Sequence, residues 1–215
     1  MIVLHDYWRS SSSYRVRIAL GLAGLEWTSV SVNLQDGEQR SKEHLERNPQ
    51  GLVPVLEIDG RRMTQSLAII EYLDETRGLR LLPKESAARA RVRALAHAIA
   101  MEIHPVCNLG VAKFAVANSN GGLTTQSWMQ HFISSGLLAF EAMLGEGAYC
   151  SGDSVGLADI CLTPQVYNAH RWEVDLSKMP KVVAIASRLS QIDAFRNAHP
   201  DRASRGGFAT KRSPK

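Results

Sequence analysis

The fold of this chain is decided by the stretch Arg9-Ser10-Ser11-Ser12-Ser13-Tyr14-Arg15-Val16-Arg17-Ile18-Ala19-Leu20, which follows the apolar run Ile2-Val3-Leu4. The apolar run predicts a strand over 2–7. After the serines the apolar residues recur at helical spacing, which predicts a helix over 11–23. Four consecutive serines stand at the junction. The first N–H groups of a helix lack intrahelical partners and carry a partial positive charge. The junction therefore favours an anion, whether phosphate, carboxylate or thiolate.

Working outward, the sequence predicts the element order β-α-β-α-β-β-α up to residue 78. A strand-helix-strand start makes a parallel pair, and Asp59-Gly60 is typical of a two-residue hairpin turn that adds antiparallel strands. Ser66 is predicted to cap the last helix of this region. The strands and helices after the first helix are expected at 27–33, 42–47, 52–58, 61–64 and 66–76.

Beyond a linker at 78–85, the pattern is helical only. A long helix over 87–118 is expected to kink near Pro105. Further helices are expected at 124–144, with Thr124 as its cap, and at 157–172, 180–189 and 191–198. The predicted fold class is therefore α/β plus all-α. The predicted domains are an α/β domain over 1–80, a helical domain over 86–201 and a basic tail over 202–215 that we expect to be disordered.

Charge and composition exclude several classes of protein. The net charge of +4 comes from the tail, because removing its five basic residues leaves the body at −1. The body has no basic face with interleaved aromatics, so nucleic-acid binding is not expected. No apolar run approaches the ~18 residues of a membrane span, and no secretory signal is visible. The cysteines Cys107, Cys150 and Cys161 have no metal-binding spacing, so no metal is expected, and they suit a reducing cytoplasm.

The predicted element order, with Val53-Pro54 ahead of the third strand, resembles the cytosolic glutathione transferase family over about residues 1–200. The finer motifs are similar to the zeta class of that family. They are Ser10 to Leu20, Asn48-Pro49, Gln65 to Leu73, Ala158-Asp159, and Pro164-Gln165-Val166 followed by Arg171 and Val174-Asp175-Leu176. The resemblance implies an N-terminal thioredoxin-like βαβαββα domain, a helical-bundle domain that binds substrate, glutathione as cofactor, a homodimer and a cytoplasmic location.

The serine run is the candidate catalytic site. A hydroxyl that donates to sulfur at a helix N-terminus favours the thiolate form of a thiol. In the family the first serine of the motif has this role, which implies Ser10, with Ser11 and Ser12 as alternatives. Many relatives have a cysteine where Ser12 stands, and its absence argues against thiol–disulfide exchange. The alternative interpretation is that the serines only cap a helix.

The resemblance also implies how glutathione is held. Gln65 and Ser66 would bind its γ-glutamyl carboxylate, and the backbone of Val53, held by Pro54, would bind its cysteinyl part. A proline at this position raises the possibility of a cis bond, which the sequence does not establish. The full set of expected glutathione contacts is Ser10, Ser11, Ser12, Ser13, Tyr14, Arg15, Gln39, Val53, Pro54, Gln65, Ser66, His104 and Asn108.

Four arginines are candidates for binding the carboxylates of a substrate, because guanidinium suits bidentate carboxylate contacts. Arg9 and Arg171 are preferred on the resemblance, whereas Arg15 and Arg17 are expected to support structure or shape the field. The alternative for each is a solvated surface charge. Asp159 is expected to stabilise a helix start, although Gly156 stands where the family has Ser or Thr.

The resemblance implies a glutathione-dependent cis–trans isomerase that acts on a maleyl ketoacid, a dicarboxylate, by reversible thiolate addition. The first choice is maleylacetoacetate to fumarylacetoacetate in tyrosine and phenylalanine catabolism, and maleylpyruvate is the close alternative. Glutathione conjugation or dehalogenation of small α-haloacids uses the same residues and stays open, as does a non-catalytic scaffold. A glutaredoxin-like thioltransferase is not expected, because the first 100 residues contain no cysteine.

Overall fold

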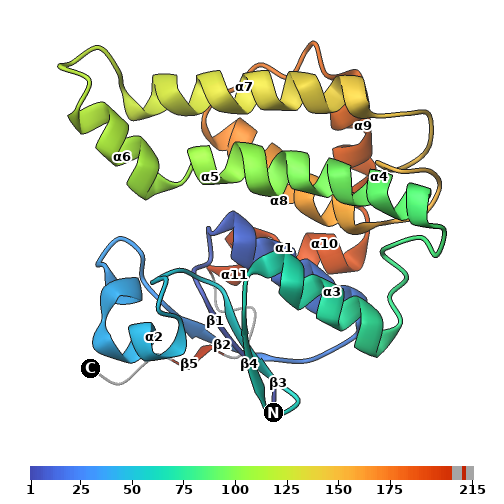
Figure 1. Cartoon of the computed structure of the whole chain (residues 1–215), viewed down its shortest axis with the longest axis horizontal. Helices are drawn as coiled ribbons and strands as arrows, with labels where there is room; N and C mark the ends of the chain where they lie inside the picture. The colour runs from blue at the N-terminus through green and yellow to red at the C-terminus, as the bar shows by residue number, and fades with distance from the viewer. Residues whose placement is uncertain (205–209, 212–215) are drawn as a thin grey trace. The chain divides into compact units, whose positions relative to one another are not determined.

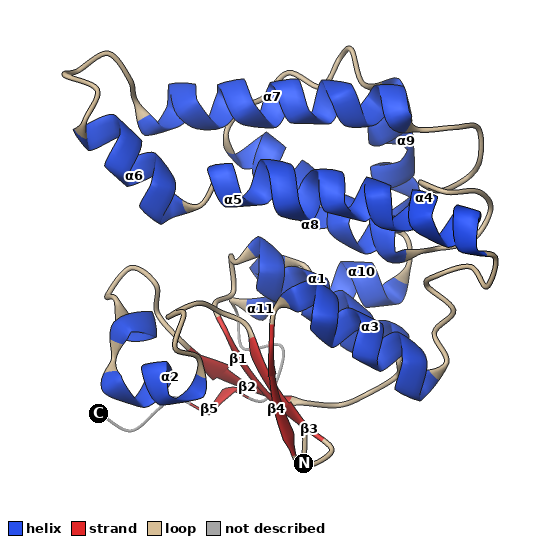
Figure 2. Cartoon of the chain, in the orientation of Figure 1, coloured by secondary structure: helices blue, strands red, loops and turns tan. Residues whose placement is uncertain are grey.

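The computed structural model describes residues 1–204 and 210–211. They form two compact units, Met1–Leu79 together with the chain from Gln191 onward, and Arg80–Ser190. The α/β plus all-helical architecture is confirmed, with the strands in the first unit and helices alone forming the body of the second (Figure 1, Figure 2). The segment from Gln191 belongs to the first unit, whereas the sequence predicts residues up to 201 in the helical domain.

A five-stranded sheet in the order β4-β3-β1-β2-β5 forms the centre of the first unit. The predicted parallel pair is present as β1 and β2, and β3 runs antiparallel to both β1 and β4. Asp59 and Gly60 have φ of 53° and 69°, as a hairpin turn with two left-handed residues requires. The strands are β1 (Val3–Asp6), β2 (Thr28–Ser31), β3 (Val55–Ile58), β4 (Arg61–Thr64) and β5 (Thr210–Lys211).

Helices α1 and α3 pack side by side, and α10 packs on α1 (Figure 1). Helix α1 is enclosed on nearly every side, and Arg15 and Arg17 are only 2% and 0% exposed. The alternative of a solvated charge is therefore wrong for these two arginines. The helices of this unit are α1 (Ser11–Leu22), η1 (Glu38–Arg40), α2 (Lys42–Arg47), α3 (Ser66–Arg77), α10 (Asp193–Asn197) and α11 (Pro200–Ala203).

The tail predicted to be disordered carries regular backbone where the structure describes it. Residues 202–203 end helix α11, and 210–211 form strand β5, which pairs in parallel with β2. The structure thus differs from the prediction at these residues: 202–203 complete a short helix, and pairing with β2 gives 210–211 a strand that their own sequence does not predict. For residues 205–209 and 212–215 the prediction lies outside the described residues.

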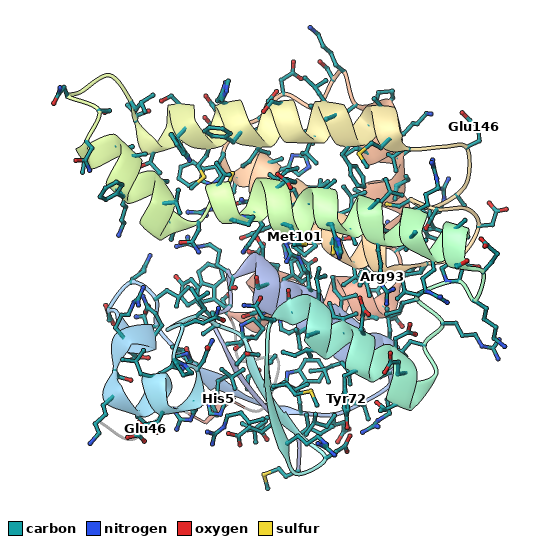
Figure 3. The ribbon with its side chains drawn as sticks, in the orientation of Figure 1. His5, Glu46, Tyr72, Arg93, Met101 and Glu146 are labelled. Carbon is teal, nitrogen blue, oxygen red and sulfur yellow. The ribbon has the colours of Figure 1, made fainter. Side chains whose placement is uncertain are left out.

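Helix α3 is tied to the hairpin of β3 and β4 through Tyr72, which lies on the hairpin side of α3 in Figure 3. The Tyr72 hydroxyl donates to the Asp59 carboxylate at 2.7 Å, and Arg77 donates to the same carboxylate at 2.7 Å. These two donors hold the pKa of Asp59 below its usual range. The turn that sets the β3–β4 register is thus fixed by the helix that follows it.

The predicted long helix of the second unit is interrupted twice. Helix α4 (Ser86–His97) continues as a π-helix, η2 (Ala98–Ile103), and as α5 (His104–Val106) before α6 (Leu109–Ala117) starts. The chain bends by 41° between Val106 and Leu109, so the kink expected at Pro105 lies slightly later. Pro105 is tolerated at the start of α5, whereas the Asn108 side chain accepts from the Gly110 N–H and begins a new helix.

Three longer helices complete the second unit and lie close to their predicted bounds. Thr124 caps α7 by accepting from the Ser127 N–H, as its position predicted. Glu141 of α7 accepts from the first N–H groups of α9, at 3.0 Å from Lys181 and 2.8 Å from Val182. The helices are α7 (Thr125–Met143), α8 (Leu157–Arg171) and α9 (Pro180–Leu189). Within the described residues no single helix is both long and apolar enough to span a membrane. Only when the bent helix pair 86–106 and 109–117 is taken together does it have the length and apolar composition of a span.

Asp159 fixes the start of α8, as the sequence predicts. Its side chain is buried and accepts from the backbone N–H of Gly156 at 2.8 Å and of Cys150 at 2.9 Å. Burial raises the pKa of the Asp159 carboxyl, although these donors oppose that shift. The carboxylate thus fastens the loop at residues 150 and 156 to the first turn of α8, while Gly156 supplies no side-chain cap.

Replacing Asp159 by alanine removes the acceptor of two buried N–H groups, each of which costs about 1–3 kcal/mol when unsatisfied. We expect Asp159→Ala to lower the free energy of unfolding in urea by about 3 kcal/mol. The matched control is Asp153→Ala, which removes an exposed carboxylate from the same loop and is expected to cost less than about 0.5 kcal/mol. Equal losses in the two variants would contradict the assignment.

Candidate functional site

The serine run lies where β1 ends and α1 begins. Ser10 is the cap residue of α1, with φ −66° and ψ 124°, and its Oγ accepts from the Ser13 N–H at 3.2 Å. The capping interpretation is therefore confirmed for Ser10. An Oγ that accepts from the backbone still has its O–H to donate, so capping and anion binding are compatible.

The four serines and Tyr14 differ in exposure. Ser10, Ser11 and Ser12 are half-buried, whereas Ser13 is 0% and Tyr14 2% exposed. The Tyr14 hydroxyl donates to the Phe195 carbonyl at 3.4 Å. Of the predicted contacts in this run, the first three serines are thus partly accessible, whereas the side chains of residues 13–14 are buried.

Arg9 lies in the same loop and keeps its guanidinium partly exposed. Its Nη2 donates to the Tyr7 hydroxyl at 3.4 Å, and its Cζ stands 4.9 Å from the centre of the Trp8 ring. These aromatic neighbours hold the side chain near the start of α1 without neutralising its charge. The carboxylate-binding role of Arg9 stays a prediction, for which guanidinium has the suitable geometry.

A second helix N-terminus stands at the start of α3. The predicted cap was wrong by one residue, since the structure has Gln65 at the cap and Ser66 as the first helical residue. Gln65 has φ 68° and ψ 109°, a backbone conformation that a side chain makes costly. Gln65 makes no side-chain cap hydrogen bond to α3.

The N-terminus of α3 is supported by a buried cation. The Arg15 guanidinium, on α1, donates to the Ser66 Oγ at 3.2 Å. Because Arg15 is buried, its charge acts through a medium of lower polarity and adds to the positive end of the helix. Arg15 thus links the two helix N-termini that the sequence predicts as anion sites.

The other side of this site is formed by the turn before β3. The Val53-Pro54 peptide bond is cis, which the sequence left undecided, and Pro54 is buried just ahead of β3. The preceding Leu52 carbonyl accepts from His44 Nε2 at 3.0 Å and from Asn48 Nδ2 at 2.9 Å. Val53 itself is half-buried.

Two glutamine side chains join the turn to the start of α3. The Gln65 Nε2 donates to Gln50 Oε1 at 2.8 Å, so the predicted amide contact of Gln65 is paired within the protein. Gln39 lies in η1. The Gln39 carbonyl oxygen is so close to Gly51 that a Cβ added at Gly51 would meet it at 3.0 Å. The segment around Gln39 therefore packs on the turn that precedes Val53.

The remaining predicted residues belong to the second unit. His104 begins α5, and Asn108 uses its Oδ1 to cap α6 at 2.9 Å from the Gly110 N–H. Arg171 ends α8 with its guanidinium 4.6 Å from the centre of the Trp172 ring. The binding roles predicted for His104, Asn108 and Arg171 stay predictions. Among residues 1–204 and 210–211, no cluster of His, Cys, Asp or Glu is arranged to hold a metal ion.

Residues 9–76 match the family model described as the glutathione S-transferase N-terminal domain. Maleylacetoacetate isomerase of Rhizobium meliloti (strain 1021) is 60% identical over 206 residues, which cover 94% of this chain and 97% of the relative. A bacterial zeta-class maleylpyruvate isomerase has a solved holo structure with a TM-score of 0.88 and 37% identity, covering 93% of this chain and 97% of that chain. This chain belongs to the zeta class of the glutathione transferases.

Two further relatives agree with this zeta-class assignment. Maleylacetoacetate isomerase of Rattus norvegicus is 46% identical, covering 93% of each chain. The structure of maleylacetoacetate isomerase from Methylobacterium extorquens AM1, with bound malonate and glutathione, has a TM-score of 0.87 and 38% identity and covers 93% of this chain and 97% of that chain. The resemblance drawn from the serine run and the Gln65-Ser66 motif is thus confirmed.

The strained backbone of Gln65 yields a test of this site. Gln65→Gly and Gln65→Ala both remove the amide, but only alanine keeps the Cβ that disfavours φ 68°. We expect the glycine variant to unfold with a free energy about 1 kcal/mol higher than the alanine variant in urea. Equal stabilities would contradict the strained geometry at the start of α3.

Proposed function

We propose that this protein is a glutathione-dependent cis–trans isomerase of a maleyl ketoacid, with maleylacetoacetate as its substrate. The observation that carries the proposal is the pair of helix N-termini, at Ser10 and Ser66, linked by the hydrogen bond from Arg15 to Ser66. The 60% identity to a maleylacetoacetate isomerase supports the choice of substrate.

The residues of the first unit fit glutathione. The start of α3, backed by the buried charge of Arg15, suits the γ-glutamyl carboxylate. The backbone at Val53 suits the cysteinyl part, and the start of α1 with the Ser10 hydroxyl suits a thiolate. Solved relatives from Methylobacterium extorquens and Anaeromyxobacter dehalogenans hold glutathione, which supports this interpretation. When bound, glutathione supplies a thiolate that adds reversibly to a carbon–carbon double bond conjugated with a carbonyl.

The protein's own groups then have three tasks. Ser10 donates its O–H to the sulfur anion and lowers the thiol pKa, and each pKa unit corresponds to about 1.4 kcal/mol of preference for the charged form. The partial positive charge at the start of α1 acts in the same direction. Arg9 binds a substrate carboxylate and orients the double bond beside the sulfur.

Maleylpyruvate is the second candidate substrate. The zeta-class maleylpyruvate isomerase with a TM-score of 0.88 favours it, since it shares the fold over 93% of this chain. The two substrates are chemically alike in the maleyl group on which Ser10 and Arg9 would act. They differ in the length of the ketoacid, and Ser10 and Arg9, which would act on the shared maleyl group, do not distinguish the two lengths.

We further propose that the enzyme is a homodimer in the cytoplasm. The three cysteines are free and buried, which suits a reducing compartment. Exposed apolar side chains in the second unit, among them Met101, Val111 and Phe114, support self-association. We expect sedimentation velocity to give a species of twice the chain mass of 23.7 kDa. A monomer at micromolar concentration would contradict the dimer.

The role of Ser10 can be separated from its capping function. Ser10→Ala loses both the hydroxyl and the cap, whereas Ser10→Asp keeps a cap acceptor but places a negative charge beside the sulfur. We expect both variants to lower kcat/KM for isomerisation about 100-fold, the scale of losing one donor to a developing anion. Only Ser10→Ala should lose stability, by about 1 kcal/mol.

The matched comparison gives a clear contradiction. If Ser10 serves only as a cap, Ser10→Asp retains full isomerase activity and Ser10→Ala loses stability alone. Ser12→Ala is the second control, since Ser12 is an alternative donor, and we expect its activity to stay within about threefold of the parent protein.

A further inference from the structure

The buried guanidinium of Arg17 joins three separate segments of the first unit. Its Nη1 donates to the Asp6 carboxylate at 2.7 Å, its Nη2 to the Trp8 carbonyl at 2.8 Å and its Nε to the Ala198 carbonyl at 3.1 Å. The side chain of Arg17 is completely inaccessible to solvent. One rigid planar group thus fixes the end of β1, the loop that follows it and the chain after α10.

The contact with Trp8 lies two residues before Ser10. The loop over 7–10 otherwise has the Ser10 N–H donating to the Tyr7 carbonyl at 2.9 Å. Together these two bonds set where the loop leaves the sheet and where α1 begins. Because Arg17 itself lies on α1, the Trp8 bond is a brace between the body of the helix and the loop that carries its cap.

The C-terminal segment is held against the same helix (Figure 1). Besides Ala198, the Phe195 carbonyl accepts from Tyr14, and the His199 ring lies edge-on to the Tyr14 ring at 6.0 Å. Gly21 gives α10 its close approach, since a Cβ there would meet Ala194 at 3.2 Å. The segment that closes the first unit is therefore fastened to the back of α1 by Arg17 and Tyr14.

A buried ion pair by itself does not explain this arrangement. Desolvation usually offsets most of the attraction of such a pair, so Arg17 and Asp6 add little net stability as charges. Two of the three Arg17 bonds instead go to backbone carbonyls in loops. Bonds of this kind fix the position of the backbone. The position matters because the Ser10 hydroxyl has to lie within a fraction of an ångström of its working place to stabilise an anion.

We propose that Arg17 is a positioning residue for the thiolate site, which it serves by bracing the Trp8 carbonyl so that the Ser10 hydroxyl faces the sulfur. The inference rests on the proposed role of Ser10. Asp6 orients the guanidinium, and Ala198 extends the brace to the C-terminal segment. No part of Arg17 is accessible to glutathione or substrate.

The test uses the full-length protein with glutathione and follows the ultraviolet absorbance of the bound thiolate against pH. Arg17→Lys keeps the positive charge beside Asp6, but one ammonium group does not reach three acceptors on three segments. We expect it to raise the pKa of bound glutathione by about one unit, which is a tenfold loss of thiolate at pH below that pKa. The Kd of glutathione should change far less, because the start of α3 is untouched.

Asp6→Asn is the second variant and decides the outcome if Arg17→Lys does not fold. The amide still accepts the Nη1 bond, but it no longer attracts the guanidinium as a charge. Removal of a negative charge near the site would by itself lower the thiol pKa. A rise in the thiol pKa of bound glutathione therefore reports lost positioning and not lost charge.

Gly21→Ala is the matched control, since it strains the α1–α10 contact without touching the loop over 7–10. We expect it to lower stability in urea and to leave the thiol pKa and kcat as in the parent protein. An unchanged thiol pKa in folded Arg17→Lys and Asp6→Asn, or the same rise in Gly21→Ala, would overturn the proposal.

Failure of this inference is distinguishable from failure of the proposed function. If Ser10→Ala leaves the thiol pKa of bound glutathione unchanged, the role of Ser10 is wrong and the positioning of Ser10 loses its purpose. If Ser10→Ala raises that pKa and Arg17→Lys does not, the function stands and only the positioning role of Arg17 is lost.

Discussion

The backbone at the start of α1 is the constraint on which the rest of the site depends. A helix N-terminus stabilises an anion only where its first N–H groups and its cap hydroxyl are held in place. The cap is Ser10, and the loop before it is held by the Tyr7 and Trp8 carbonyls. The side chains that fix this loop are those of Arg17 on α1 and Asp6 at the end of β1, and both are buried.

The start of α3 is likewise supported by a buried side chain of α1. Arg15 lies on α1 about one turn after the Ser10 cap, and its guanidinium donates to Ser66 at the start of α3. Helix α1 thus connects the two N-termini. Arginine is rare inside a protein, and two of them two residues apart on an enclosed helix are costly to bury. Their hydrogen bonds to the cap region, the loop and the C-terminal segment account for that cost.

Much of the local structure in both units was predictable from the sequence. The hairpin at Asp59-Gly60, the cap at Thr124 and the bounds of α2 and α9 follow from turn and cap residues that act locally. The serine run and the Gln65-Ser66 motif identified both helix N-termini. Capping by the serine run was the alternative interpretation from the sequence, and it is accessible there because a cap hydroxyl acts within one turn of its own backbone.

The remaining features depend on contacts across the chain. The cap of α3 moved from Ser66 to Gln65 because the turn from β4 forces a left-handed residue there, which no propensity favours. Strand β5 has two residues and forms only by pairing with β2. The C-terminal segment joins the first unit because Arg17 and Tyr14 offer it partners more than 180 residues away, at 3.1 and 3.4 Å. Sequence periodicity carries none of this information.

The zeta-class assignment leaves isomerisation, conjugation and dehalogenation as the candidate reactions. They differ in whether glutathione is regenerated or consumed. Isomerisation returns the thiol, whereas conjugation and dehalogenation consume it. The measurement that tests the account most directly is turnover of maleylacetoacetate with substoichiometric glutathione, while the free thiol is quantified. The account predicts many turnovers to the trans product for each glutathione, with the thiol unspent. Product formation that stops after one equivalent of glutathione would contradict it.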